Sequence, residues 1–141
     1  MGFSVILPGI MHLNVPISPG EFLDKLTILE IKIERIADPG KLENVRRERD
    51  LLAATWAASP RASADVSAQV AELKRVNEAL WEIEDRIRVK ESAAAFDAEF
   101  IELARSVYHT NDRRAEIKRE INRALASDLV EEKSYAEYRK G

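Results

Sequence analysis

The fold is decided by the stretch SPGEFLDKLTILEIK, residues 18–32. Ser18 can cap a helix N-terminus, and Pro19 suits the first helical position because its missing N–H group would have no intrahelical partner there. Glu21 can reach back to the Ser18 amide, as in a capping box. Apolar side chains then follow at helical spacing and form one stripe, which comprises Phe22, Leu26, Leu29, Ile33 and Ile36. The sequence therefore predicts a first helix from Pro19 to about Ala37.

Turn signals divide the rest of the chain into three more predicted helices. The second covers about 39–58, and a loop rich in Ser and Pro follows it. The third and fourth cover about 65–91 and 97–126, and the third has apolar residues at heptad-like spacing. The junction SAAA at 92–95 contains no Gly or Pro, so one long helix remains an alternative to a hairpin. Asp97 can cap a new helix, which favours the hairpin.

The predicted fold class is all-α. We expect an antiparallel helical bundle, or long helical hairpins, of about four helices. A chain of 141 residues suits one domain, which we divide into an extended N-terminal arm at 1–17, a helical bundle at 18–126 and a C-terminal tail at 127–141. Within the arm, Val5–Leu7 and Val15–Ile17 can form short edge strands between prolines. The tail is polar, and we expect it to be loosely held.

Composition excludes several classes of function. The net charge is −3 and acids alternate with bases, which argues against nucleic acid or a membrane surface as a partner. The absence of cysteine excludes disulfides, thiol catalysis and thiolate zinc sites. We expect no metal site and no cofactor, and the cytoplasm is the default compartment. A helical domain with so few aromatic residues often completes its core by pairing with a second copy.

Polar residues lie on the apolar faces of three predicted helices. Seven or eleven residues return a helix to nearly the same direction, so Asn111, Lys118 and Asn122 share a line on a buried face. In a hairpin that turns near Ala94, Asn77 should lie opposite Asn111, and Lys118 needs an acidic partner such as Glu21 or Asp24. The candidate polar site comprises Glu21, Asp24, Lys25, Lys32, Arg35, Asn77, Glu84, Asn111, Lys118 and Asn122.

These polar residues allow three interpretations. They can fix the register of the helices, since a polar group in a seam excludes misaligned pairings. They can instead form a polar pocket, in which Lys25, Lys32, Arg35 and Lys118 receive an anion while carboxylates do acid–base work. In the third interpretation the polar lines face solvent. The sequence does not decide whether the protein is an enzyme.

Three ordered segments resemble a family of short bacterial proteins that is described only as a domain of unknown function. They are SPGEFLDKLTILEIK from Ser18, NEALWEIED from Asn77 and FIELARSVYHTND from Phe100. The resemblance extends from about Val15 to Tyr135, so the leading residues 1–14 fall outside it. It implies a cytoplasmic helical protein and transfers no catalytic role to any residue.

Two hypotheses for the function follow. The first is a helical interaction protein or oligomeric scaffold, whose partner is itself or another protein. Such a protein should have a dry, paired polar seam and an exposed apolar stripe. The second is a small all-α enzyme or binding protein for an anionic metabolite. That protein should have a concave, solvent-connected pocket that contains several of Lys25, Lys32, Arg35 and Lys118.

Overall fold

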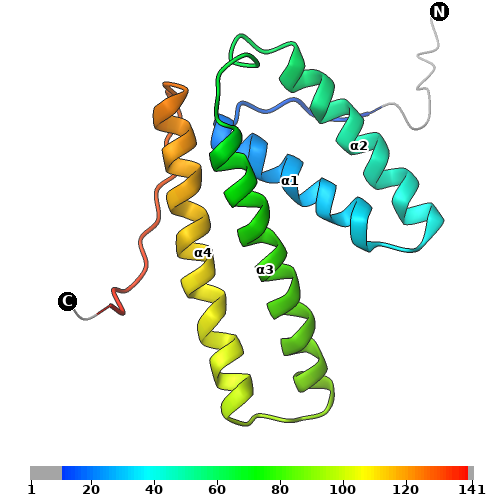
Figure 1. Ribbon diagram of the computed structural model, residues 1–141, viewed down its shortest axis with the longest axis vertical. Coiled ribbons are helices and arrows are strands. Elements are labelled where there is room, and N and C mark those ends of the chain that lie inside the picture. Colours follow the sequence, from blue (N-terminus) through cyan, green and yellow to red (C-terminus); the bar gives the residue numbers. More distant parts are fainter. Residues whose placement is uncertain (1–10, 140–141) are drawn as a thin grey trace, which may run out of the picture.

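The computed structural model describes residues 11–139, which form four α-helices (Figure 1). Helix α1 spans Pro19–Arg35, α2 spans Pro39–Ala57, α3 spans Ser67–Ser92 and α4 spans Ala98–Ala124. This part of the chain contains no strand, and the helices pack against one another, which confirms the all-α fold class. Every helix begins and ends within two residues of its predicted boundary.

Side-chain caps explain where the helices begin. The Ser18 hydroxyl accepts the N–H of Glu21 at 3.2 Å, and Asp38 starts α2 in the same way. The Asp97 carboxylate accepts the N–H of Phe100 at 3.0 Å, so the predicted cap of the fourth helix is confirmed. The carboxylate of Glu21 has a different partner from the expected Ser18 amide, which is described below with the site.

The junction between α3 and α4 is a tight turn, so the two helices form a hairpin. Ala94 adopts the left-handed conformation, with φ of 50°. The N–H of Ala95 donates to the carbonyl of Lys90 at 2.9 Å, and the N–H of Ala94 donates to that of Glu91 at 3.0 Å. These two bonds make a Schellman motif, in which glycine usually holds the left-handed position. Alanine occupies this position here, so the sequence contained no turn signal and one long helix remained an alternative.

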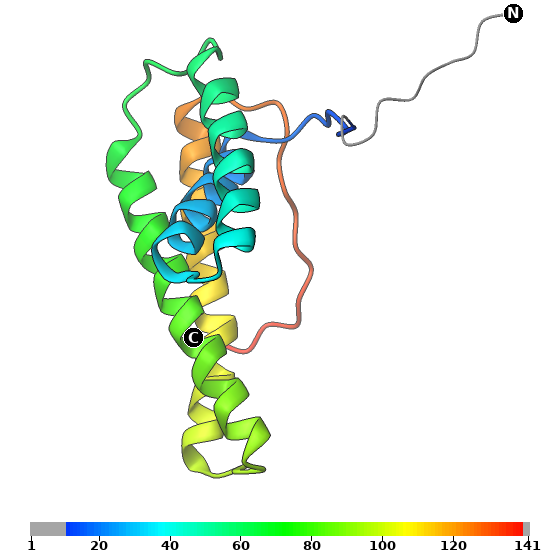
Figure 2. The ribbon, with the colours of Figure 1, turned by 90° about the vertical axis from the view of Figure 1, so that its right-hand side faces the viewer.

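The helices are arranged as two hairpins of unequal length (Figure 1). Helices α3 and α4 form the long hairpin, and α1 packs on both of them. Among the four described helices, α2 packs on α1 alone, and none of its residues is fully buried. The short hairpin covers one half of the long one, and the half that ends at the α3–α4 turn extends beyond it (Figures 1 and 2).

The apolar core lies where α1 meets the start of α3 and the end of α4. Leu73, Ile117 and Ile121 are completely buried there. Leu23 of α1 joins the same cluster, and Trp56 at the end of α2 packs against it. The Trp56 ring also stacks on Phe22 at a centroid distance of 5.9 Å, which fastens the end of α2 to α1.

The segments outside the helices differ from expectation. Residues 15–17 form no strand, and residues 5–7 lie outside the described part of the chain. The tail at 127–139 has no regular secondary structure but runs along α4 (Figures 1 and 2), where several of its side chains bind. The expectation of a loosely held tail stays a prediction, because these residues are exposed but do contact α4. None of the described helices is long and apolar enough to cross a membrane.

Gly20 marks the closest approach of α1 to α4. A Cβ atom at this position would lie 2.5 Å from the carbonyl oxygen of Lys118 and 2.9 Å from Oδ1 of Asn122. The Gly20 N–H donates to that same Oδ1 at 2.7 Å. Because only glycine fits, the first turn of α1 can lie directly against the backbone of α4.

Replacing Gly20 by Ala tests this approach. Alanine normally stabilises a helix over glycine by roughly 0.5–1 kcal/mol. Here the added methyl group pushes α1 away from α4, and overpacking of this kind costs about 1–3 kcal/mol. We expect Gly20→Ala to lower the free energy of unfolding measured in urea. Gly40→Ala is the matched control, since its Cβ would meet only Asp38 Oδ2 at 3.4 Å. Equal stabilisation by both substitutions would contradict the close approach.

Candidate functional site

A single buried carboxylate joins three helices. Asp24 of α1 is 0% exposed. Its Oδ1 accepts hydrogen bonds from Nδ2 of Asn77 on α3 at 2.8 Å and from Nε of Arg114 on α4 at 2.9 Å. Nη2 of Arg114 binds the second oxygen, so the guanidinium grips the carboxylate with two parallel bonds. This bidentate bond raises the pKa of Arg114 above its ordinary value.

Thr27 completes the polar contacts around Asp24. Its hydroxyl donates to the Asp24 carbonyl at 2.8 Å and accepts from Nδ2 of Asn77 at 3.0 Å. The Asn77 amide therefore donates to two groups of α1 from a position where it is itself buried. A buried amide left without partners would cost about 1–3 kcal/mol, so these bonds favour one register of α3 against α1.

Lys118 forms a second polar contact between α4 and its surroundings. Its ammonium lies 2.5 Å from Oε2 of Glu21 on α1 and 2.8 Å from Oε2 of Glu131 in the tail. Burial alone would lower the pKa of Lys118, but the hydrogen bonds that it donates to Glu131 and Glu21 outweigh burial and raise that pKa. The predicted pairing of Lys118 with Glu21 is thus present.

The polar residues of α4 follow one line along the helix. Arg114, Lys118 and Asn122 are four residues apart, and each one binds α1. Asn122 does so through the Gly20 amide described above. The Arg114 guanidinium binds Asp24, the Lys118 ammonium binds Glu21, and the Asn122 carboxamide binds the Gly20 amide. We name Asp24, Thr27, Asn77, Arg114, Lys118, Glu21, Asn122, Gly20 and Glu131 the polar clamp.

Other predicted site residues lie outside the polar clamp. Lys25 is exposed, and Lys32 is half-buried on the same helix. Arg35 forms an ion pair with Glu82. Glu84 forms one with Arg88 at 3.4 Å, on the surface of α3. Lys25, Lys32 and Arg35 follow one another along α1, whereas Glu84 lines the groove described next.

Asn111 lies beside the clamp and is half-buried. It lines a groove of about 410 Å³ together with Asn77, but the Asn77 amide bonds to α1 and forms no hydrogen bond with Asn111. The groove lies between α1, α3 and α4 and is lined by Ile28, Ile31, Asn77, Leu80, Trp81, Glu84, Asp85, Asn111 and Arg114. Its walls are mostly apolar.

Arg114, Thr27 and Glu131 were missed by sequence reasoning. Arg114 has a usable signal, because it precedes Lys118 by four residues and therefore shares its face. Thr27 follows Asp24 by three residues, which is the spacing of its hydroxyl bond to the Asp24 carbonyl. Glu131 has no such signal, since it lies in a segment without periodicity.

The clamp has little capacity for acid–base chemistry as it stands. Asp24 is held by a guanidinium and an amide, and Lys118 is held by two carboxylates. A general base or nucleophile needs a free lone pair at a reacting atom, whereas the Asp24 oxygens accept bonds within the clamp and the Lys118 ammonium has no lone pair. Residues 11–139 also contain no group of three or more His, Asp or Glu side chains that could hold a metal ion.

The contact between Glu131 and Lys118 predicts a pH dependence of the tail. The hydrogen bond from Lys118 lowers the pKa of Glu131 below the ordinary 4.5, and Lys133 and Arg114 act in the same direction. A lowered carboxyl pKa stabilises the folded state above the unfolded pKa, and this contribution is lost as the pH falls through the folded value. The raised pKa of Lys118 acts at the other extreme, because its contribution is lost only at alkaline pH.

We therefore expect the tail to loosen at acidic pH, below 4.5. Heteronuclear NOE values of residues 129–132 should fall there. Glu131→Gln should give the same low values at neutral pH, because it removes the carboxylate that Lys118 binds. Glu132→Gln is the matched control and should leave the tail ordered. A tail that is equally ordered in Glu131→Gln and in the unaltered protein would contradict this contact.

Comparison with known proteins places the chain in a family. A family of unknown function, DUF6165, matches residues 13–139, which include all four helices and every residue of the polar clamp. Comparisons with curated proteins and with solved structures each found no match. The comparisons therefore assign no activity to the all-α fold or to the polar clamp. The chain belongs to the family of unknown function DUF6165.

Proposed function

We propose that this chain is a helical interaction protein that associates with a second copy of itself through the uncovered half of the α3/α4 hairpin. One observation carries the proposal. The short hairpin covers only the half of α3 and α4 that holds the apolar core and the polar clamp (Figure 1). Beyond it, α3 and α4 continue as two antiparallel helices with no other described helix packed on them.

The uncovered half carries exposed apolar side chains near its turn. Val89 is 67% exposed, Phe96 is 58% exposed and Ile101 is 55% exposed. Two helices alone can bury only the stripes that face each other, whereas two hairpins together make a four-helix arrangement with a common core. The exposed apolar stripe that an interaction protein should have is therefore supported by these three residues.

Charges at the turn are paired within the chain. Lys90 on α3 lies 2.8 Å from Asp97 and 3.1 Å from Glu99 across the turn, and Arg86 lies 2.9 Å from Glu99. With these four charges paired inside the chain, the exposed apolar groups become the main feature that this surface offers to a partner. A second copy suits such a surface, because a two-fold interface brings the same patch from both subunits together.

The positions of the four cations predicted to form an anion pocket support the metabolite hypothesis less than the interaction hypothesis. Lys25, Lys32, Arg35 and Lys118 line none of the described cavities together, and Lys118 already binds two carboxylates. The paired seam is instead the arrangement that suits an interaction protein, in which buried polar groups fix register.

Sedimentation equilibrium tests the proposed dimer. At about 100 µM chain, well above the dissociation constants of ordinary homodimers, the mass should be twice 16.0 kDa. The double substitution Val89→Glu with Ile101→Glu should return the mass to that of the monomer. Helix content should not change, because both side chains are exposed in the monomer. Leu51→Glu on α2 is the control, since this exposed leucine lies outside the hairpin, and it should leave the dimer intact.

Two results would contradict the proposal. One is a monomeric mass for the unaltered protein at this concentration. The other is a dimer that the double substitution does not weaken, which would place the interface elsewhere.

A further inference from the structure

The C-terminal tail is bound to α4 at two separated points. Glu131 binds Lys118 near the end of the helix. Further along, the Tyr138 hydroxyl donates to the carboxylate of Asp112, and Arg139 lies 3.5 Å from that carboxylate. The tail therefore runs along α4 in the opposite direction to the helix (Figure 2).

Aromatic contacts strengthen the second attachment point. The Tyr138 ring lies edge-on to Tyr108 at a centroid distance of 4.8 Å and edge-on to His109 at 5.1 Å. Edge-to-face pairs of this kind stabilise a contact beyond the effect of the area that they bury. The tail is thus held on α4 by both a hydrogen bond and ring packing.

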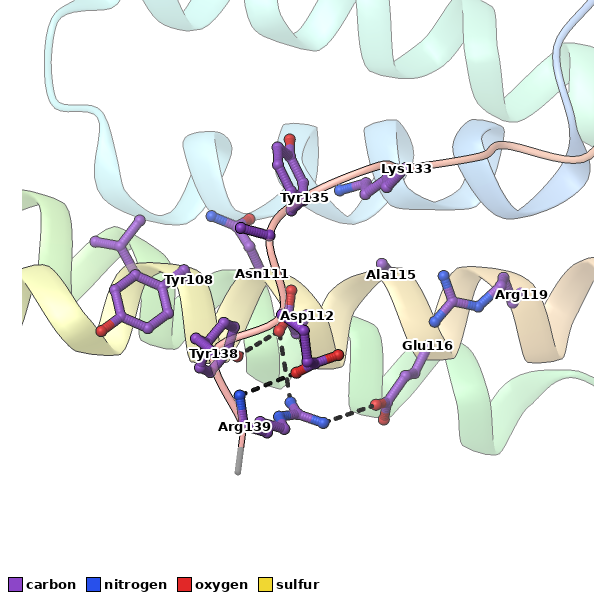
Figure 3. A pocket seen from close by; sticks show the side chains of 13 residues that line it. Tyr108, Asn111, Asp112, Ala115, Glu116, Arg119, Lys133, Tyr135, Tyr138 and Arg139 are labelled. Carbon is purple, nitrogen blue, oxygen red and sulfur yellow. Dashed lines mark hydrogen bonds and ion pairs between the residues drawn. The ribbon is translucent and has the colours of Figure 1, made fainter. Parts of the chain in front are cut away.

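Between these two points the tail and α4 enclose a cleft of about 680 Å³ (Figure 3). This volume lies within the range of small-molecule sites, which is about 300–1,000 Å³. The floor is formed by Ala115, whose small side chain leaves room above the helix. Figure 3 shows Arg119 and Lys133 towards one end of the cleft, and Tyr108 and Tyr138 towards the other.

Two of the three acidic groups that line the cleft are paired with a cation. Asp112 accepts from Tyr138 and pairs with Arg139. Glu116 lies 3.1 Å from Arg113. The third acid, Glu137, accepts the backbone N–H of Arg139 at 2.9 Å.

Two cations that line the cleft have no counter-ion. Arg119 and Lys133 form no ion pair with any residue from 11 to 139. Lys133 instead lies over the ring of Tyr135, 5.9 Å from its centroid. The carboxylate of Glu137, which forms no ion pair within the described part of the chain, offsets one of these two charges, so the cleft keeps an excess of one positive charge although the chain as a whole is negative. Such a cleft should attract an anion.

We infer that this cleft binds a phosphate monoester that carries a ring. The planar guanidinium of Arg119 suits phosphate oxygens, which it can bind in pairs, and Lys133 adds a second positive charge. Tyrosine rings offer flat apolar faces to a ring of the ligand. Tyr135 is 79% exposed and has its ring available for this contact. Neither the helical fold nor the proposed dimer requires this site.

Isothermal titration calorimetry with the full chain tests the inference, using AMP, glucose 6-phosphate, adenosine and inorganic phosphate as probes. At least one of the two phosphate monoesters should bind with a saturable heat. Adenosine and inorganic phosphate should each bind roughly tenfold more weakly, because each lacks half of the contacts. Preference between the two monoesters distinguishes a nucleobase from a sugar as the ring that the tyrosines contact.

Three substitutions locate the binding. Arg119→Gln and Lys133→Gln should each weaken binding roughly tenfold, the effect of losing one charge-assisted contact. Arg123→Gln removes an exposed cation one turn further along α4 and should change affinity less than about twofold, as expected for a distant screened charge. Tyr138→Ala should also weaken binding, because it frees the tail, while circular dichroism of the helices stays unchanged.

Two results would overturn the inference. The first is the absence of saturable binding for both phosphate monoesters at millimolar concentration. The second is an equal loss of affinity in Arg119→Gln, Lys133→Gln and Arg123→Gln, which would mean general attraction of an anion to α4 rather than binding in the cleft.

Discussion

The arrangement of the helices depends on the buried carboxylate of Asp24. A charge without a partner in this place would cost several kcal/mol, so α1 can pack here only if Arg114 and Asn77 reach it. Those two side chains come from different helices of the long hairpin. One carboxylate therefore sets where α1 lies along α3 and along α4 at the same time. Apolar residues such as Leu23 and Ile117 supply the attraction, but they would tolerate other registers.

The position of α1 has consequences at both ends of the molecule. Its first turn meets α4 at Gly20, where the missing side chain admits the Asn122 carboxamide. Glu21 then reaches Lys118, and Lys118 also holds Glu131 of the tail. The position of α1, which Asp24 fixes, therefore also affects the tail, and the tail forms one wall of the cleft. Because α1 is shorter than the long hairpin, it leaves the other half of α3 and α4 uncovered (Figure 1).

Much of this arrangement was predictable from local signals. Helix caps at Ser18 and Asp97 and the apolar stripes located all four helices, and Asn77, Lys118 and Asn122 were identified because they interrupt those stripes. Periodicity gives the face on which a residue lies but not its partner on another helix. Arg114 was therefore not among the predicted site residues, although it binds Asp24. The tail was missed because extended segments have no period, and Ala94 gave no turn signal because glycine usually holds its conformation.

A double-mutant cycle on Asp24 and Arg114 tests the central claim most directly. The free energy of unfolding would be measured for Asp24→Asn, for Arg114→Gln and for both together, with the surface pair Glu43 and Arg47 as a control cycle. Arg114→Gln should cost about 3–5 kcal/mol, since it leaves Asp24 buried without its counter-charge, and Asp24→Asn should cost less, since the Arg114 side chain is 28% exposed. The double variant should lose much less than the sum, with a coupling of about 2 kcal/mol or more, whereas the control pair should couple by less than about 0.5 kcal/mol. A coupling between Asp24 and Arg114 as small as that of the control pair would contradict the account.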